Sequence, residues 1–198
     1  MKYLYAIFMS MVILSTSGCV GIIAGAAATG VVVATDPRSS QQIWTDENVE
    51  FEVAGINNKA PYSGNVRIAA SSYNGVVVLM GQARSEQLNQ SFEEKVRKLK
   101  GVKSVHSEVQ IMPPLALSAV SNDSWITTKV KSALLTSNDL NGLKIKVITE
   151  NGEVFLLGYV NHKQAEIATQ IARNISGVKR VVQAFQYNDQ ASANSTSS

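Results

Sequence analysis

The sequence is poor in the residues that build metal sites and covalent cross-links. Its 198 residues include one cysteine and two histidines, too few for a structural zinc site or a disulfide framework. Charge is also sparse, because only 17% of the residues are charged and the formal net charge is +3. So mild a balance excludes a strongly basic nucleic-acid binder, and we expect no nucleic-acid partner.

Enzyme motifs are missing as well. The sequence contains no Walker loop, no Rossmann fingerprint, no G-x-S-x-G and no H-E-x-x-H. His106 and His162 have no Cys, Asp or Glu at ligand spacing, so we expect both to be structural or solvent-facing. We therefore predict no catalytic residue, no metal ligand and no cofactor, and consider an enzyme acting on peptidoglycan or lipid the least favoured function.

The N-terminus has the pattern of an export signal. Lys2 is the only charge before Asp36, and the apolar run that follows it ends in Ser15-Thr16-Ser17-Gly18. A positive start, a short apolar region and small residues before a cut site predict a signal peptide over residues 1–18. Cys19 directly after Gly18 resembles a bacterial lipobox, although Thr16 stands where that pattern usually has Leu. The resemblance implies that Cys19 carries acyl chains such as palmitate.

Two alternatives remain for this region: an uncleaved membrane anchor and a buried free thiol at Cys19. Residues 20–34 are uncharged and, joined to the signal, could reach the roughly 20 apolar residues that span a bilayer. Several glycines interrupt the stretch, and each disfavours a helix by roughly 1 kcal/mol. We favour a lipidated Cys19 followed by an apolar, flexible linker over 19–44. Because Val20 and not Asp follows the cysteine, resemblance to Gram-negative lipoproteins implies the periplasmic face of the outer membrane.

The remainder of the chain contains an internal repeat. Asn74–Gly81 aligns with Asn151–Gly158, and Gly101–Val105 aligns with Gly177–Val181. In each copy an Asn-Gly pair between two alternating apolar runs predicts a hairpin with a type I′ turn.

The same order of elements is predicted in each copy. An amphipathic helix precedes the hairpin, at about 46–57 and 123–136, and a second helical pattern follows it. Gly101 and Gly177 are expected at the C-caps of these second helices, before a last strand. The order αββαβ predicts an α+β fold in which a three-stranded mixed sheet packs against two helices. The predicted strands are 66–72, 76–82, 102–111, 143–149, 153–159 and 178–187.

These two units, with their paired NG…G and GVK.V signatures, resemble BON domains (bacterial OsmY and nodulation). The lipobox, ATDPRS at 34–39, SNDSWITTKVKSALLTS at 121–137 and TENGEVFLLG at 149–158 are similar to outer-membrane lipoproteins with two BON domains. The predicted domains are BON domain 1 at 45–112, a linker at 113–122, BON domain 2 at 123–187 and a disordered tail at 188–198.

Charge distinguishes the two copies. Basic and acidic residues balance between 41 and 112, whereas basic residues exceed acidic ones between 121 and 187, so an acidic partner should prefer the second copy. In the helix 123–136, helical periodicity places Trp125 and Leu135 off the core face and beside two lysines. An exposed Trp flanked by Lys is typical of an interfacial helix. The candidate lipid-binding residues are Trp125, Lys129, Lys131, Ser132, Leu135 and Thr136.

The first helix of the first copy offers a contrast. Phe51 lies opposite its apolar stripe, with Asp46, Glu47, Glu50 and Glu52 around it. That surface should be repelled by anionic lipid, so we expect it to pack on the second copy or to contact a protein.

The resemblance implies a function at the membrane. It implies binding to anionic phospholipids such as phosphatidylglycerol and cardiolipin, maintenance of outer-membrane integrity during envelope stress, and concentration at the cell division site. The alternative is a protein-interaction adaptor for envelope machinery, for which the resemblance implies the β-barrel assembly complex as partner. For Trp125 itself a structural alternative remains, because a Trp at the edge of a helix is often covered by the sister domain and is then unavailable to lipid.

Overall fold

The structure, a computed structural model, describes residues 38–140 and 145–187. The predicted signal peptide, Cys19 and the tail 188–198 lie outside the described residues. The described elements follow one another as α2 (Ser40–Asn57), β1 (Val66–Tyr73), β2 (Val76–Ala83), α3 (Glu86–Arg97), β3 (Ser104–Ile111), α4 (Leu117–Leu135), β4 (Ile145–Glu150), β5 (Glu153–Val160), α5 (His162–Arg173) and β6 (Arg180–Tyr187).

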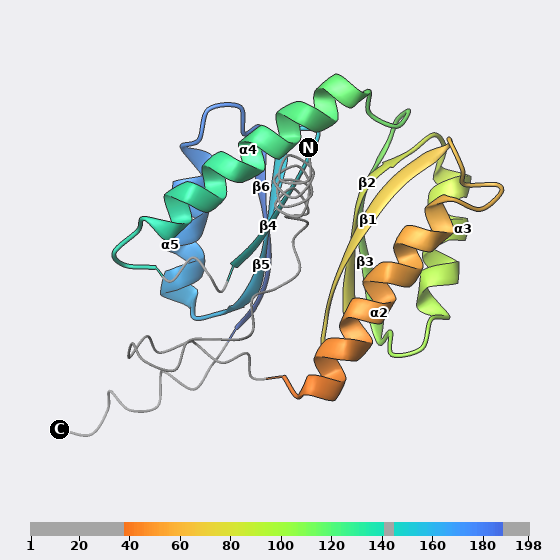
Figure 1. The fold of residues 1–198 in the computed structure, drawn as a ribbon, viewed down its shortest axis with the longest axis horizontal. Helices are drawn as coiled ribbons and strands as arrows, with labels where there is room; N and C mark the ends of the chain where they lie inside the picture. Colours follow the sequence, from red (N-terminus) through yellow and green to blue (C-terminus); the bar gives the residue numbers. More distant parts are fainter. Residues whose placement is uncertain (1–37, 141–144, 188–198) are drawn as a thin grey trace, which may run out of the picture. The chain divides into compact units, whose positions relative to one another are not determined.

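Each copy folds into the predicted αββαβ unit. The sheets have the orders β1-β2-β3 and β4-β5-β6. In each sheet the first two strands are antiparallel and the last two parallel, so both sheets are mixed as predicted. The two helices of each copy cover one face of its sheet (Figure 1). The hairpin residues Asn74 and Asn151 both have φ of 52°, followed by glycines at 79° and 77°, as a type I′ turn requires.

Both cores consist of the inward stripes of helices and strands. In the first copy, Val49 and Val53 of α2 meet Leu79 of β2 and Phe92 of α3, all 1% exposed or less. The second copy repeats this arrangement with Ile126 and Val130 of α4 against Leu156 of β5. Because these residues must face the core, the packing determines which residues of α2 and α4 point outward.

A buried aspartate on the first helix of each copy holds the hairpin turn. Asp46 is 1% exposed and accepts hydrogen bonds from the backbone N–H groups of Asn74 at 2.8 Å and Gly75 at 2.9 Å. Asp123 is 4% exposed and accepts the equivalent bonds from Asn151 at 2.7 Å and Gly152 at 2.8 Å. The interpretation of Asp46 as part of an acidic surface was therefore wrong, because its charge is used inside the fold.

The two glycines expected to cap α3 and α5 lie elsewhere. The C-caps are Lys98 and Asn174, and Gly101 and Gly177 follow three residues later with φ of 94° and 100°. A Cβ on Gly177 would lie 3.1 Å from the side chain of Ile126. A Cβ on Gly101 would overlap the methyl group of Thr45. These glycines thus let the connecting turn approach the first helix of each copy.

Both first helices begin earlier than expected. α2 starts at Ser40, where Ser39 Oγ accepts a hydrogen bond from the Gln42 N–H, so the predicted linker 19–44 ends in helix. α4 starts at Leu117, inside the predicted linker 113–122. Its N-cap is Ala116, which forms no side-chain capping bond. The sequence therefore lacks the polar cap that normally marks a helix start.

The two sheets contact each other through the faces that their helices leave free. Val78 and Met80 of β2 form one apolar cluster with Phe155 and Leu157 of β5. Among the described residues, three ion pairs join the copies around it: Arg67 with Glu150, Lys146 with Glu50 at 2.8 Å, and Arg180 with Glu108 at 3.1 Å.

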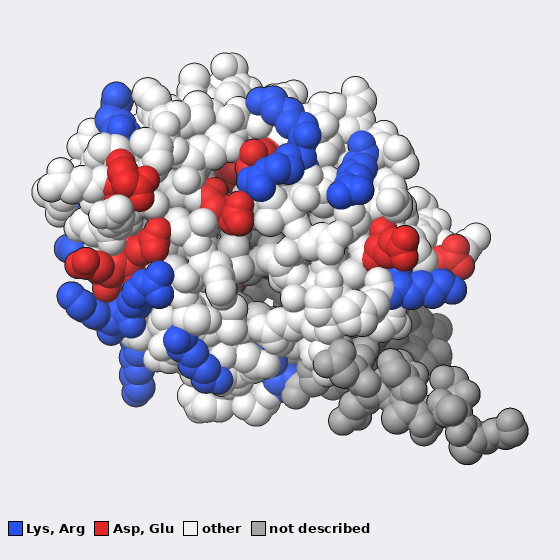
Figure 2. Space-filling model, turned by 180° about the vertical axis from the view of Figure 1, so that it is seen from behind, with Lys and Arg blue, Asp and Glu red and all other residues white. Residues whose placement is uncertain are grey.

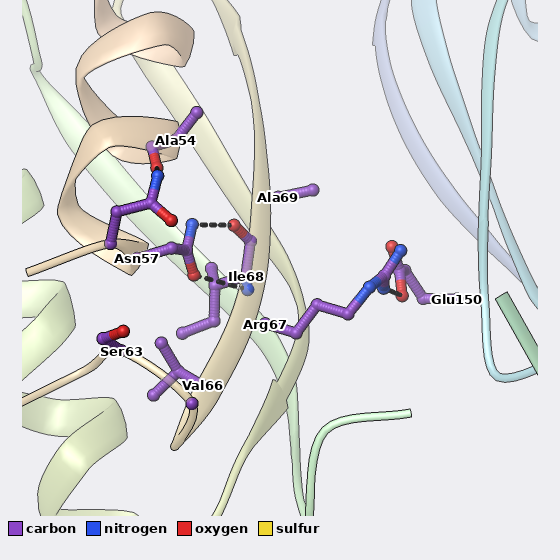
Figure 3. Close-up of a pocket in the computed structure, with 10 residues that line it drawn as sticks. Ala54, Asn57, Ser63, Val66, Arg67, Ile68, Ala69 and Glu150 are labelled. Carbon is purple, nitrogen blue, oxygen red and sulfur yellow. Dashed lines mark hydrogen bonds and ion pairs between the residues drawn. The ribbon is translucent and has the colours of Figure 1, made fainter. Parts of the chain in front are cut away.

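The outer edge of β1 is closed by a side chain. Asn57, at the end of α2, donates to the Ile68 carbonyl at 2.7 Å and accepts from the Ile68 N–H at 2.9 Å (Figure 3). An asparagine amide thus occupies the place that a neighbouring strand would take at this edge.

Candidate functional site on helix α4

Helix α4 is held by one face and exposed on the other. Its inward residues Ile126, Val130 and Leu134 are 1% exposed or less. On the opposite side Trp125 is 62% exposed and Leu135 is 54% exposed. The predicted outward position of both residues agrees with the structure, and the sister domain does not cover Trp125.

A third apolar residue, Leu117, extends this surface. It is 84% exposed and lies 18 residues before Leu135, which is five complete turns and about 27 Å along the helix. Leu117 was not among the predicted site residues, because residues 113–122 were expected to be linker. We call the exposed set Leu117, Trp125, Lys131, Ser132 and Leu135 the α4 face.

Several hydroxyl groups beside these apolar residues are bonded to the helix itself. Ser124 Oγ donates to the Val120 carbonyl and Thr128 Oγ1 to the Ser124 carbonyl, both at 3.0 Å. Thr136 Oγ1 lies 3.1 Å from the Ser132 carbonyl in the same way. These hydroxyl protons need no water, which lowers the cost of placing the helix against apolar material. Thr136, a predicted lipid-binding residue, therefore has its hydroxyl proton already bonded.

The two predicted lysines differ. Lys131 is exposed, and it forms no ion pair within the described part of the chain. Lys129 is half-buried, and its Nζ donates a hydrogen bond to the Ser176 carbonyl. Of the two lysines predicted to bind lipid, Lys131 is therefore the more available to an anionic headgroup, because Lys129 already has a partner.

The face of the molecule shown in Figure 2 has no large surface of one charge. On the face in Figure 2, basic and acidic side chains lie interspersed among broad areas with neither. Arg180, for example, is paired with both Glu108 and Glu153, which raise the pKa of its guanidinium, with the bond to Glu153 as the main cause. A binding surface on this face would therefore depend on apolar contact supported by single charges.

A cavity of about 400 Å³ lies between the end of α2 and β1, and several of the polar groups that line it are bonded to one another. Asn57 is paired with Ile68, and Arg67 with Glu150 (Figure 3). Burial raises the pKa of Glu150, although Arg67 and Gln82 act in the opposite direction. We assign this cavity no ligand.

Within residues 38–140 and 145–187, no three His, Cys, Asp or Glu side chains come together as metal ligands do. His162 instead stacks on Tyr187, with ring centroids 4.1 Å apart. In the same ranges no helix has both the length and the hydropathy to cross a bilayer.

Comparison with known proteins identifies the fold. The BON domain family matches residues 45–113 and 122–189. The outer membrane lipoprotein DolP of Haemophilus influenzae is 39% identical over 173 residues, which cover 87% of this chain and 90% of that protein. A 21 kDa hemolysin of Actinobacillus pleuropneumoniae is 37% identical over 153 residues, or 77% of this chain and 79% of that protein.

A solved structure of CdsD, a structural protein of the type III secretion system of Chlamydia trachomatis, matches this chain at 21% identity. The match covers 73% of this chain and 65% of CdsD. Its TM-score is 0.28, too low to support an argument.

The chain therefore belongs to the BON-domain family. More narrowly, it is a dual-BON lipoprotein similar to DolP over most of its length.

Proposed function

We propose that this outer-membrane lipoprotein binds anionic phospholipids through the α4 face and thereby helps to maintain outer-membrane integrity. In this proposal Cys19 carries the acyl anchor, the BON domains face the periplasm, and the lipid contact concentrates the protein at the division site. The similarity to DolP, the lipobox resemblance and the exposed α4 face support it.

The observation that carries the proposal is the outward position of Trp125. It is 62% exposed on a helix whose inward residues Ile126, Val130 and Leu134 are buried, and Leu117 and Leu135 are exposed on the same outward side. Indole rings prefer the headgroup region of a bilayer, where their apolar body and their N–H are both satisfied. Lys131, six residues further along, places one cation where lipid phosphates would lie.

The energies indicate weak binding by α4 alone. Full burial of Trp125, Leu135 and Leu117 would contribute roughly 1.5–3 kcal/mol each. Lys131 adds about 1 kcal/mol at an anionic surface. These gains are offset in part by the loss of motional freedom on binding. Weak binding by α4 is enough for a protein whose acyl anchor lies in the same membrane, because the anchor provides a high effective concentration of headgroups.

The alternative is an adaptor that contacts envelope machinery such as the β-barrel assembly complex. The same exposed α4 face could serve a protein partner, so the two functions differ in their dependence on lipid. An adaptor would retain its partner in the absence of phospholipid and would not distinguish anionic from zwitterionic vesicles.

The test is vesicle co-sedimentation of the segment 35–198, which forms one compact unit. With phosphatidylglycerol vesicles, Trp125→Glu should lower the affinity by about tenfold or more, because it replaces an inserted ring with a repelled carboxylate. The circular dichroism spectrum should not change, since Trp125 lies outside the core.

Phe51→Glu is the matched control, because Phe51 is 79% exposed on the equivalent helix of the first copy. It should leave vesicle binding unchanged. Equal binding of wild-type protein and Trp125→Glu would show that α4 is not the lipid-binding surface. Equal binding to phosphatidylglycerol, cardiolipin and phosphatidylcholine vesicles would favour the adaptor.

A further inference from the structure

Helix α2 also has an exposed apolar surface, and it faces away from the first core. Trp44 is 65% exposed and Phe51 is 79% exposed. They are seven residues apart, so they lie on one line about 10 Å long, opposite Val49 and Val53. The expectation that Phe51 packs on the second copy was therefore wrong. Within the described ranges this surface is uncovered.

The charges beside these aromatic residues are acidic and available. Glu47 and Glu52 are exposed, and neither forms an ion pair among the residues that the structure describes. Other acidic groups of α2 are already used: Asp46 by the hairpin turn and Arg38, and Glu50 by Lys146. We call Trp44, Glu47, Phe51 and Glu52 the α2 face. Its two carboxylates exclude an anionic membrane as its occupant.

The α2 face and the α4 face are complementary. On α2, Glu47 lies between Trp44 and Phe51 along the helix. On α4, Lys131 lies between Trp125 and Leu135. Two such helices can pack with their apolar residues in contact and with the carboxylate opposite the ammonium group.

We propose that the α2 face of one molecule binds the α4 face of a second copy of this chain. The contact joins two different surfaces, so it leaves one of each kind free and can extend into short rows of molecules. An α4 face held by a second copy does not touch lipid, so a row binds lipid through its one free α4 face. A single helix-to-helix contact is smaller than a standard stable interface, so it is weak between free molecules. Tethering to one membrane raises the local concentration of copies and makes it effective.

Photo-cross-linking of the full chain tests the contact. A photoreactive phenylalanine analogue replaces Phe51, and the full chain is reconstituted at high density into phosphatidylcholine vesicles that contain no anionic lipid. Mass spectrometry of the product should locate the cross-link on α4 of a second copy. Glu47→Lys and Lys131→Glu, each alone, should lower the yield about fivefold, and the two combined in one chain should restore at least half of it. Glu94→Lys, an exposed carboxylate on α3, is the matched control and should have no effect.

Each other outcome overturns the proposal. These outcomes are a cross-link to residues 19–37 of the same chain, a cross-link to a different protein, no cross-link, or a yield that the charge reversals do not change. Because the vesicles contain no anionic phospholipid, the result is separate from that for anionic lipid binding. Loss of vesicle binding with the cross-link intact would overturn the proposed function and leave this contact standing.

Discussion

The two BON domains are alike where they face inward and different where they face outward. Asp46 and Asp123 hold the two hairpin turns in the same way, and the stripes of α2 and α4 fill equivalent cores. On the opposite sides of these helices, aromatic residues are accompanied by carboxylates on α2 and by a lysine on α4. One fold can therefore present two unlike surfaces, because the outward residues of α2 and α4 are not part of either core.

The largest expected effect concerns the turn anchors. Asp46 accepts bonds from Asn74, Gly75, Ser72, Arg38 and Gln42, whereas bonds to Asp123 come from Asn151 and Gly152. We expect Asp46→Ala to lower the free energy of unfolding by about 3–4 kcal/mol and Asp123→Ala by about 2 kcal/mol, because each leaves buried N–H groups unpaired. Urea denaturation measures both.

Asn at each position is the control, since it retains one acceptor oxygen, and both Asn variants should be more stable than the Ala variants. Equal losses for Asp46→Ala and Asp123→Ala would show that the extra partners of Asp46 contribute nothing.

A smaller effect separates the two lysines of α4. Lys131→Gln should lower the affinity for phosphatidylglycerol vesicles about fivefold, close to 1 kcal/mol. Lys129→Gln should lower it less than about twofold, because its Nζ is bonded to the Ser176 carbonyl. Titration with vesicles at low salt measures the difference, which should shrink as salt rises. A larger loss for Lys129→Gln would mean that this side chain leaves Ser176 to reach the lipid.

The smallest effect is a pH dependence at the contact between the copies. Burial raises the pKa of Glu150 above its ordinary value of 4.5, despite Arg67 and Gln82. A raised pKa in the folded state means that the contribution of Glu150 to stability is fully present below about pH 4.5 and falls as the pH rises through the folded value. Glu150→Gln should remove this fall, and its new amide can donate to the buried Gln82 Oε1, which lacks a partner among the described residues.

Unfolding free energies of wild type and Glu150→Gln between pH 4 and pH 8 provide the measurement. The difference between them should change in favour of the variant as the pH rises. Asp46 acts in the opposite sense, and serves as the comparison. Burial alone would raise its pKa, but the bonds from Gly75, Ser72, Arg38 and Asn74 hold that pKa below 3.8, so its stabilisation is lost as the pH falls. If the difference in unfolding free energy between wild type and Glu150→Gln did not change with pH, the raised pKa of Glu150 would be contradicted.

Much of the fold was predictable from local patterns. The repeated Asn-Gly pairs and helical stripes determine the order of elements, and the outward position of Trp125 follows from the spacing of Ile126 and Val130. The role of Asp46 could also have been found. Asp46 and Asp123 lie three residues before the first stripe residue, 77 positions apart, as do the two Asn-Gly turns that they bind.

Other features depend on contacts that no local pattern contains. The partner of Lys129 is a backbone carbonyl 47 residues away, and backbone groups carry no residue-specific signal. The early start of α4 was missed because Ala116 supplies no cap and because Leu117 points outward. Gly101 and Gly177 were wrongly predicted at helix C-caps. Their positive φ lets the turn that follows the cap approach the first helix of the same copy.

The amide of Asn57 has a consequence for encounters with unfolded chains. It occupies both the N–H and the carbonyl of Ile68, so an extended segment cannot add to β1 there without first displacing it. At β4, the matching outer strand of the second sheet, the position equivalent to Asn57 is Leu134, which is buried in the core. In the described part of the chain, such an amide therefore opposes strand addition, and the aggregation that begins with it, at β1 and not at β4.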